Sequence, residues 1–338
     1  MRGKVGRLWA VLMACLIGGA FALVAYAGHA RDARRMAMAD AMTGSHMLRV
    51  SDLMIRRELT TAVALTPCRL SDGAVSTCYA FQTTSMPSHA AGPWCPRSAY
   101  EPGGYFVDDV RHLRNPAGRD EEKQVTVAWL REIDQRLGWS IVNPDGSVNI
   151  TNDTELAMVA DQEVGRWGYG EAASYGIVNH CVQAQPIPRT LTILIPSVPR
   201  AAAEPVDIVA AGLPGTGIAL DGVLYFPPEP VGRITTYHNV APLDATGGHT
   251  GFAYDYHYHR AREVPGVPNL RTRVYGFMFD GYPIYGATEP DGSAVRDLDR
   301  CQGHVTARLG YHYHASNAFP YLTTCLNGAV ATGMSRVG

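Results

Sequence analysis

Six of the twelve histidines fall into two groups that share one spacing. Each group has a Gly-His pair, six further residues, and then Tyr-His-Tyr-His. In an extended strand, residues i and i+2 point to the same side about 6 to 7 Å apart, so each Tyr-His-Tyr-His presents a chelating pair of imidazoles. The Gly-His imidazole completes a facial set and leaves a position for water or substrate. The predicted metal ligands are His249, His257, His259, His304, His312 and His314.

Imidazole ligands suit Cu(II), Zn(II) or Ni(II), and we expect copper or zinc and no organic cofactor. Asp244 and Asp299 stand five residues before the Gly-His histidines, and we expect them to accept the second N–H of a ligating ring. The tyrosines of each motif should face the opposite side of the strand. The alternative is a structural network in which the histidines bond to buried carbonyls or to these aspartates. One shared centre and two separate centres are both compatible with the spacing.

The two histidine groups belong to an internal repeat. Seven residues from Asp244 to His259 recur 55 positions later, from Asp299 to His314. Each copy is preceded by a related phrase that contains Asp221-Gly222 or Asp280-Gly281. We therefore predict two tandem units, about 217–259 and 276–314, that pack around a pseudo-two-fold axis.

The composition, with 35 Gly and 22 Pro among 338 residues, favours strands and turns over a helical bundle. The predicted fold is mainly β, α+β overall. We expect a β-rich segment at 67–104, a partly helical insertion at 105–188 and a duplicated β-rich domain at 189–338. Apolar spacing predicts one amphipathic helix over 120–137, and a second helix is expected from Thr154 to Trp167.

The N-terminal thirty residues have the features of an export signal. Arg2, Lys4 and Arg7 precede an uncharged run from Leu8 to Ala27 that ends in Ala-Tyr-Ala. This segment (1–30) is either a cleaved signal peptide or a membrane anchor, and a helical stalk should follow over 31–66. The expected location is periplasmic or extracellular. The formal charge of -2 without a long basic run argues against a nucleic-acid partner, and contact with a membrane is expected only through an uncleaved N-terminal segment.

Six cysteines remain outside the leader segment, an even number that indicates disulfides in an exported protein. Six cysteines allow fifteen pairings. Cys68 and Cys78 flank a Ser-Asp-Gly turn, and Cys301 and Cys325 flank the last histidine group. Cys95 and Cys181 are then left to pair with each other. Ligation of a metal by thiolates is the alternative, but no pair has Cys-x-x-Cys spacing.

The phrases Asp-x-Cys-x-Gly-His and Tyr-His-Tyr-His, together with Phe279 to Gly286 and Phe319 to Leu322, resemble the YHYH-domain family of exported proteins. The resemblance covers about 190–327 and extends to a Pro-x-His segment at Pro87 to His89. That family has no secure biochemical assignment, so the resemblance implies a domain and not an activity. The first copy has Thr246 where the second has Cys301, and it has no counterpart of Cys325, which supports pairing those two cysteines.

The sequence therefore predicts an exported metal-binding protein, with hydrolytic or redox use of the metal as an open question. The alternative is a metal-free module that binds carbohydrate or protein through the aromatic phrases near Tyr225 and Tyr285. The partner in either case would be a small molecule or a cell-envelope ligand. His89 and His238 lie outside the repeat and are expected to be structural. The glycines at 212–217 lack the spacing of a phosphate loop.

Overall fold

The computed structural model describes residues 50–55, 58–108, 121–151, 178–208, 210–227, 238–251, 256–262, 273–318 and 320–336. Its described part is mainly β, as predicted, with several sheets. The central element is an eight-stranded sheet in the order β13-β14-β12-β11-β7-β8-β10-β9. Its strands are β7 (Gly217–Ala219), β8 (Leu224–Tyr225), β9 (Gly248–Thr250), β10 (Tyr256–Tyr258), β11 (Val274–Met278), β12 (Pro283–Tyr285), β13 (Gly303–Thr306) and β14 (Gly310–His314).

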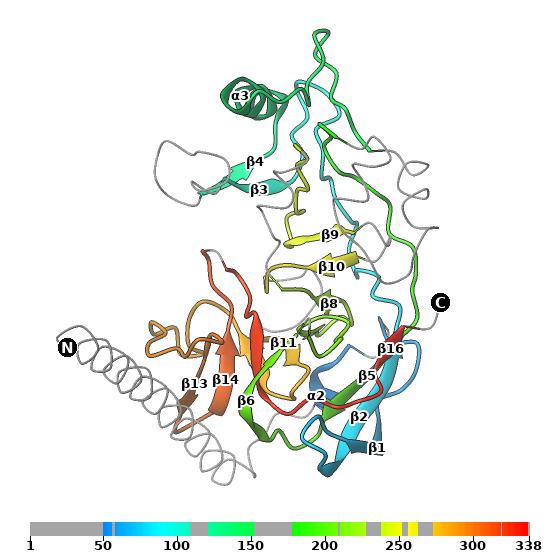
Figure 1. Cartoon of the computed structure of the whole chain (residues 1–338), viewed down its shortest axis with the longest axis vertical. Coiled ribbons are helices and arrows are strands. Elements are labelled where there is room, and N and C mark those ends of the chain that lie inside the picture. The colour runs from blue at the N-terminus through cyan, green and yellow to red at the C-terminus, as the bar shows by residue number, and fades with distance from the viewer. Residues whose placement is uncertain are drawn as a thin grey trace, which may run out of the picture.

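This sheet has the pseudo-two-fold arrangement that the repeat predicts. Strands β7-β8-β10-β9 of the first copy run outward from the centre in the same order as β11-β12-β14-β13 of the second. At the centre, β7 and β11 pair antiparallel, and Ile218 lies opposite Phe277. These two residues occupy equivalent positions in the two copies, so the local axis passes between them. Each histidine-bearing hairpin consequently lies at an outer edge of the sheet (Figure 1).

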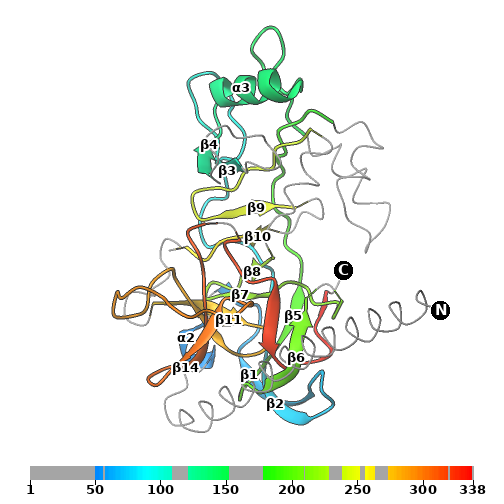
Figure 2. The same ribbon diagram turned by 60° about the vertical axis from the view of Figure 1, so that its left-hand side comes forward.

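A second sheet, in the order β1-β2-β5-β16, packs near one end of the molecule (Figures 1 and 2). It contains β1 (Ala64–Arg69), β2 (Val75–Thr83), β5 (Leu191–Pro196) and β16 (Ser335–Arg336), and β15 (Cys325–Gly328) pairs separately with β6 (Ala201–Asp207). Side chains of β2 and β5, such as Phe81 and Ile193, share one buried apolar cluster with Ile218 and Phe277 of the central sheet. Burial of this common core holds the two sheets together.

The opposite end contains β3 (Tyr105–Asp108), β4 (Glu121–Gln124) and helix α3 (Val127–Leu137). The helix begins later than the sequence predicted, because Thr126 is extended and its hydroxyl accepts a hydrogen bond from the Trp129 N–H at 3.1 Å. The residues before it pair with β3 instead. The helix ends at Gly138, whose left-handed backbone supplies the C-terminal cap, as predicted.

The described part of the expected stalk holds only the four-residue helix α2 (Val50–Leu53). Leu59 then forms a β-bridge with Thr83, and β1 begins at Ala64, so the chain is extended here because it pairs with β2. The predicted leader (1–30) and the predicted helix at 154–167 lie outside the described residues. Among the described residues, no helix has the length and apolar character to cross a membrane.

The structure forms three disulfides, Cys68–Cys78, Cys95–Cys181 and Cys301–Cys325. These are the three pairs predicted from the sequence. Cys68 and Cys78 join the β1–β2 hairpin, and Cys95 and Cys181 lie in a second apolar core with Trp129. Three disulfides in one chain are typical of an oxidising, extracytoplasmic compartment.

Two candidate metal centres

The first centre is formed by His249, His257 and His259. Strands β9 and β10 pair antiparallel with His249 directly opposite His257, and His259 follows two residues later on the same side. Each of the three Nε2–Nε2 distances is 3.1 Å. All three side chains are buried. The strand register therefore brings the three predicted ligands to one point.

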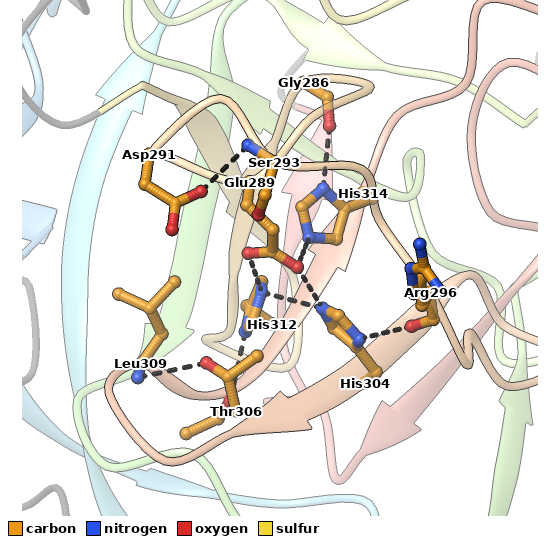
Figure 3. A network of polar contacts seen from close by, with 11 residues as sticks. Gly286, Glu289, Asp291, Ser293, Arg296, His304, Thr306, Leu309, His312 and His314 are labelled. Carbon is orange, nitrogen blue, oxygen red and sulfur yellow. Dashed lines mark hydrogen bonds and ion pairs between the residues drawn. The ribbon is translucent and has the colours of Figure 1, made fainter.

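The second centre repeats this arrangement and adds a carboxylate. His304 on β13 lies opposite His312 on β14, and their Nε2 atoms are 3.1 Å apart. Glu289, from the loop between β12 and β13, contacts all three rings (Figure 3). Its Oε1 lies 2.9 Å from Nε2 of His304 and 3.5 Å from Nε2 of His314, and its Oε2 lies 3.6 Å from Nε2 of His312.

The second centre has a fixed pattern of hydrogens on its rings. Nδ1 of His304 lies 2.7 Å from the Arg296 carbonyl, Nδ1 of His312 lies 3.0 Å from that of Gly310, and Nδ1 of His314 lies 2.7 Å from that of Gly286. A carbonyl can only accept, so each Nδ1 carries the hydrogen and, in a neutral ring, each Nε2 carries a lone pair. Three lone pairs and the Glu289 carboxylate then point at one volume.

Burial keeps two of the three rings, those of His312 and His314, from taking up a proton easily. Burial lowers the pKa of His312 from its ordinary value of 6.5 to about 3, despite its bond to Gly310. Burial also lowers the pKa of the His314 ring. Nε2 of His314 is buried and forms no hydrogen bond to any described residue. These two rings thus present Nε2 lone pairs beside a carboxylate, a donor set that a metal ion fits.

The backbone bonds that the alternative interpretation expected do exist, but they leave Nε2 available. In the first centre, Nδ1 of His259 lies 2.7 Å from the Pro227 carbonyl, at the position equivalent to Gly286. Carbonyls that orient the outer nitrogen of a ligating ring are common around metals. Hydrogen bonding of Nδ1 and metal ligation by Nε2 are therefore compatible.

The spacing of the nitrogens suits a bound metal ion. A triangle with 3.1 Å sides has its corners about 1.8 Å from its centre. Metal–nitrogen bonds of about 2.0 to 2.1 Å are long enough to reach all three corners, so His249, His257 and His259 would hold an ion through their Nε2 atoms. In the second centre, His304, His312, His314 and Glu289 would be the ligands.

The two centres are separate. Four strands lie between β10 and β14 in the central sheet, which corresponds to about 24 Å at about 4.8 Å for each strand spacing. The choice between one shared centre and two, which the sequence left open, is therefore resolved in favour of two.

The repeated aspartates have a different role from the predicted one. Asp244 accepts a hydrogen bond from the hydroxyl of Tyr256 at 2.7 Å, and Asp299 accepts one from Tyr311 at 2.8 Å. Their other oxygens accept backbone N–H groups of the following turn, from Gly248 and Gly303 respectively. The aspartates therefore bind the tyrosines of each hairpin. Backbone carbonyls, and not the aspartates, accept the outer N–H of the imidazoles.

The second tyrosine of each motif contacts the Asp-Gly turn of the same copy. Tyr258 donates to Asp221 at 3.0 Å, and Tyr313 donates to Asp280 at 2.5 Å. Burial raises the pKa of Asp280 to about 6 although Tyr313 hydrogen-bonds to it. The tyrosines thus lie opposite the histidines, as predicted, and each is anchored to a carboxylate.

The glycine of each Gly-His pair is required by the packing of a tyrosine ring. A Cβ atom built on Gly248 would overlap the phenol of Tyr256, and one built on Gly303 would overlap that of Tyr311. Only glycine leaves room for the tyrosine ring of the paired strand at this position. The glycine therefore positions the tyrosine, and through the strand register it positions the histidine next to it.

Glu289 was missed from the sequence, because it lies in a loop and has no repeat counterpart at an equal spacing. His89 and His238 lie outside both centres, as predicted. Nε2 of His89 is 3.1 Å from the hydroxyls of Tyr258 and Thr246. His238 stacks on Trp139, with ring centroids 5.1 Å apart.

Tyr225 and Tyr285 are both buried. The hydroxyl of Tyr225 donates to the Tyr275 carbonyl at 3.1 Å, and the Tyr285 ring lies edge-on to His312, with centroids 5.1 Å apart. Both rings belong to the core, so they are not exposed to contact a carbohydrate or protein ligand.

Comparison of this chain with family models, with curated proteins and with solved structures finds no match.

Proposed function

We propose that the chain is an exported protein that binds two transition-metal ions, one in each copy of the repeat. The observation that carries the proposal is the second centre. There three backbone carbonyls fix the hydrogens on Nδ1, and three Nε2 atoms, those of His312 and His314 buried, converge with a carboxylate. The first centre likewise brings three imidazole nitrogens together, each 3.1 Å from the other two. Zinc or copper suits these donors.

The rest of the proposal has support of other kinds. The three disulfides and the leader-like segment that ends near Ala27 support export to a periplasmic or extracellular location. The assignment to the YHYH-domain family is proposed on the repeated motif alone. Because the ligands come from two strands and a loop of one sheet, a bound metal would also cross-link those elements and add to the folding free energy.

The test is metal analysis of the full chain purified without an affinity tag. We expect about two equivalents of metal, one equivalent in His257→Ala, one in His312→Ala, and none in the double variant. His238→Ala is the matched control and should retain both ions, because His238 lies outside the centres. Absence of stoichiometric metal, or retention of both ions in both single variants, would overturn the proposal.

A second measurement separates a bound metal from one that supports the fold. Addition of a strong chelator should lower the melting temperature of the metal-loaded protein, since an ion that binds only the native state stabilises it. A melting temperature that does not respond to chelator, in protein shown to have lost its metal, would contradict a contribution of metal to folding.

A further inference from the structure

Arg260 follows directly after His259 and is a buried cation that the metal centres do not use. Its side chain is 3% exposed. Nη1 lies 2.6 Å from Oε2 of Glu122 on β4, and Cζ lies 3.9 Å from the centroid of the Tyr321 ring, which belongs to the loop between β14 and β15. The residue thus lies where the end of the first copy meets β4 and the loop between β14 and β15.

Two of the three guanidinium nitrogens of Arg260 have no acceptor among the described residues. Nε and Nη2 of Arg260 are buried and form no hydrogen bond within the part of the chain that the structure describes. Nη2 is the terminal nitrogen on the same edge as the Nε–H, so the two N–H bonds run parallel. This edge matches two oxygens of one carboxylate or phosphate group. Buried donors without an acceptor are unfavourable, so the edge is a place for an absent ligand.

The local charge also favours an anion. Nη2 of Arg262 lies 2.7 and 3.1 Å from the two oxygens of Glu122, so this single carboxylate is shared by two guanidinium groups. The group of Arg260, Arg262 and Glu122 therefore has an excess of one positive charge. An oxyanion on the free edge of Arg260 would neutralise it.

The two copies of the repeat differ at the position of Arg260. The residue that follows the third histidine is Arg260 in the first copy and Ala315 in the second, and both are buried. The fold therefore accommodates a small apolar residue at this position. The arginine is not required by the hairpin itself, which indicates a task that the first copy alone performs.

We propose that the Nε/Nη2 edge of Arg260 binds an oxyanion, the carboxylate or phosphate group of a small molecule, through two parallel hydrogen bonds. Tyr321 covers the guanidinium, and Glu122 fixes its other edge. The site is independent of the metal proposal, because none of its groups is a metal ligand.

The test is calorimetric titration of the full chain at pH 7 with sodium acetate and with sodium phosphate, and with sodium chloride at matched ionic strength. We expect saturable binding of acetate, phosphate or both, and none of chloride. Arg260→Ala, which reproduces the second copy, should abolish binding. Arg260→Lys keeps the charge but lacks the paired N–H groups, and should bind at least about tenfold more weakly. Arg200→Ala is the control and should still bind, because Arg200 pairs with Asp72 and is not part of this group.

The outcomes separate this site from the metal centres. Acetate binding alone assigns a carboxylate ligand, and phosphate binding alone assigns a phosphate ligand. Binding that persists unchanged after chelation supports the site at Arg260. The inference is overturned if neither oxyanion binds, if Arg260→Ala and Arg260→Lys both bind as the wild type does, or if binding disappears when metal is removed while the protein stays folded.

Discussion

Glu289 is the residue that distinguishes the second centre from the first within the described chain. Its carboxylate contacts the three histidines of that centre, the shortest contact being 2.9 Å from Nε2 of His304. Glu289→Gln keeps the size of the side chain but removes its negative charge. We expect the metal affinity of the second centre to fall by at least about tenfold, since loss of even a hydrogen-bond partner of a ligand has an effect of that size. Competition with a chromogenic chelator measures this affinity.

Asp291→Asn is the matched control, because Asp291 lies in the same loop and accepts its hydrogen bond from the Ser293 N–H at 2.9 Å. It should leave both affinities unchanged. Affinity in Glu289→Gln equal to that of the wild type would show that the carboxylate is not a ligand.

His312 should make the stability of the metal-free protein depend on pH. Its folded-state pKa is about 3, whereas the unfolded ring titrates near 6.5, so the unfolded chain takes up a proton first. The stabilisation from the neutral ring is complete above about pH 6.5 and is lost as the pH falls towards 3. We expect His312→Gln to flatten the fall in unfolding free energy over this range, by roughly a few kcal/mol. Urea unfolding with chelator at several pH values measures it, and parallel profiles for the two proteins would contradict it.

The six histidines could be predicted as a site because their spacing alone aligns them. The period of two in an extended strand places His257 beside His259 whatever the surrounding fold. Glu289 could not be predicted in the same way, since a loop residue acquires its direction from tertiary contacts. Asp244 was assigned to the wrong partner for a similar reason. Its distance from the histidine in the sequence does not show that the tyrosine hydroxyl lies closer.

At the scale of the elements, each centre depends on the register of one hairpin. The methyl group introduced by Gly303→Ala should displace the Tyr311 ring and weaken its hydrogen bond to Asp299. We expect a loss of about 1 to 3 kcal/mol in unfolding free energy, as for other overpacked sites. The second centre should also bind metal more weakly while the first is unchanged.

Gly73→Ala, in the turn between β1 and β2, is the comparison for Gly303→Ala. A Cβ there meets no atom within 4 Å, although the φ of +84° adds backbone strain. It should lower stability without changing metal affinity. Equal effects of the two substitutions on the second centre would show that contact with Tyr311 does not set the register.

The disulfides should contribute to stability in the order of the loops that they close. The sequence separations are 10 residues for Cys68–Cys78, 24 for Cys301–Cys325 and 86 for Cys95–Cys181. In the chain-entropy model, their removal costs about 2.7, about 3.4 and about 4.6 kcal/mol respectively. Paired Cys→Ser variants, compared by denaturant unfolding, test the order. A smaller loss for Cys95–Cys181 than for Cys68–Cys78 would contradict it.

At the scale of the whole molecule, the repeat predicted the symmetric sheet but not what covers its tyrosine face. In the second copy β15 does so. The Asn327 amide donates to Asp299 and Tyr311 at 2.7 and 2.6 Å, and its backbone N–H donates to Tyr313 at 2.7 Å. No pattern in the sequence links this strand to the tyrosines, because its contacts are chosen by the packed sheet.

In the first copy, the segment from Ser88 to Gly92 occupies the equivalent place. Ser88 donates to Asp221 at 3.2 Å, and the Gly92 N–H donates to Asp244 at 3.2 Å. Between them, the His89 ring contacts the hydroxyls of Tyr258 and Thr246. The segment 88–92 and strand β15, which share no repeated sequence, thus bind equivalent aspartates and tyrosines in the two copies.

This equivalence predicts that the residue type of Asn327 can replace His89. Nδ1 of His89 lies 3.0 Å from the Ala90 carbonyl, and its Nε2 contacts the hydroxyls of Tyr258 and Thr246. The side chain at position 89 thus bonds to the tyrosine face of the first copy, as the Asn327 amide does in the second. We expect His89→Asn to keep about 1 kcal/mol of unfolding free energy that His89→Ala loses, because the amide offers both a donor and an acceptor in place of the ring nitrogens. Denaturant unfolding of both variants at neutral pH measures the difference. At His238, which stacks on Trp139 outside the repeat, Asn should have no comparable advantage over Ala. Equal stability of the two His89 variants would mean that the segments share a place in the fold without sharing a function there.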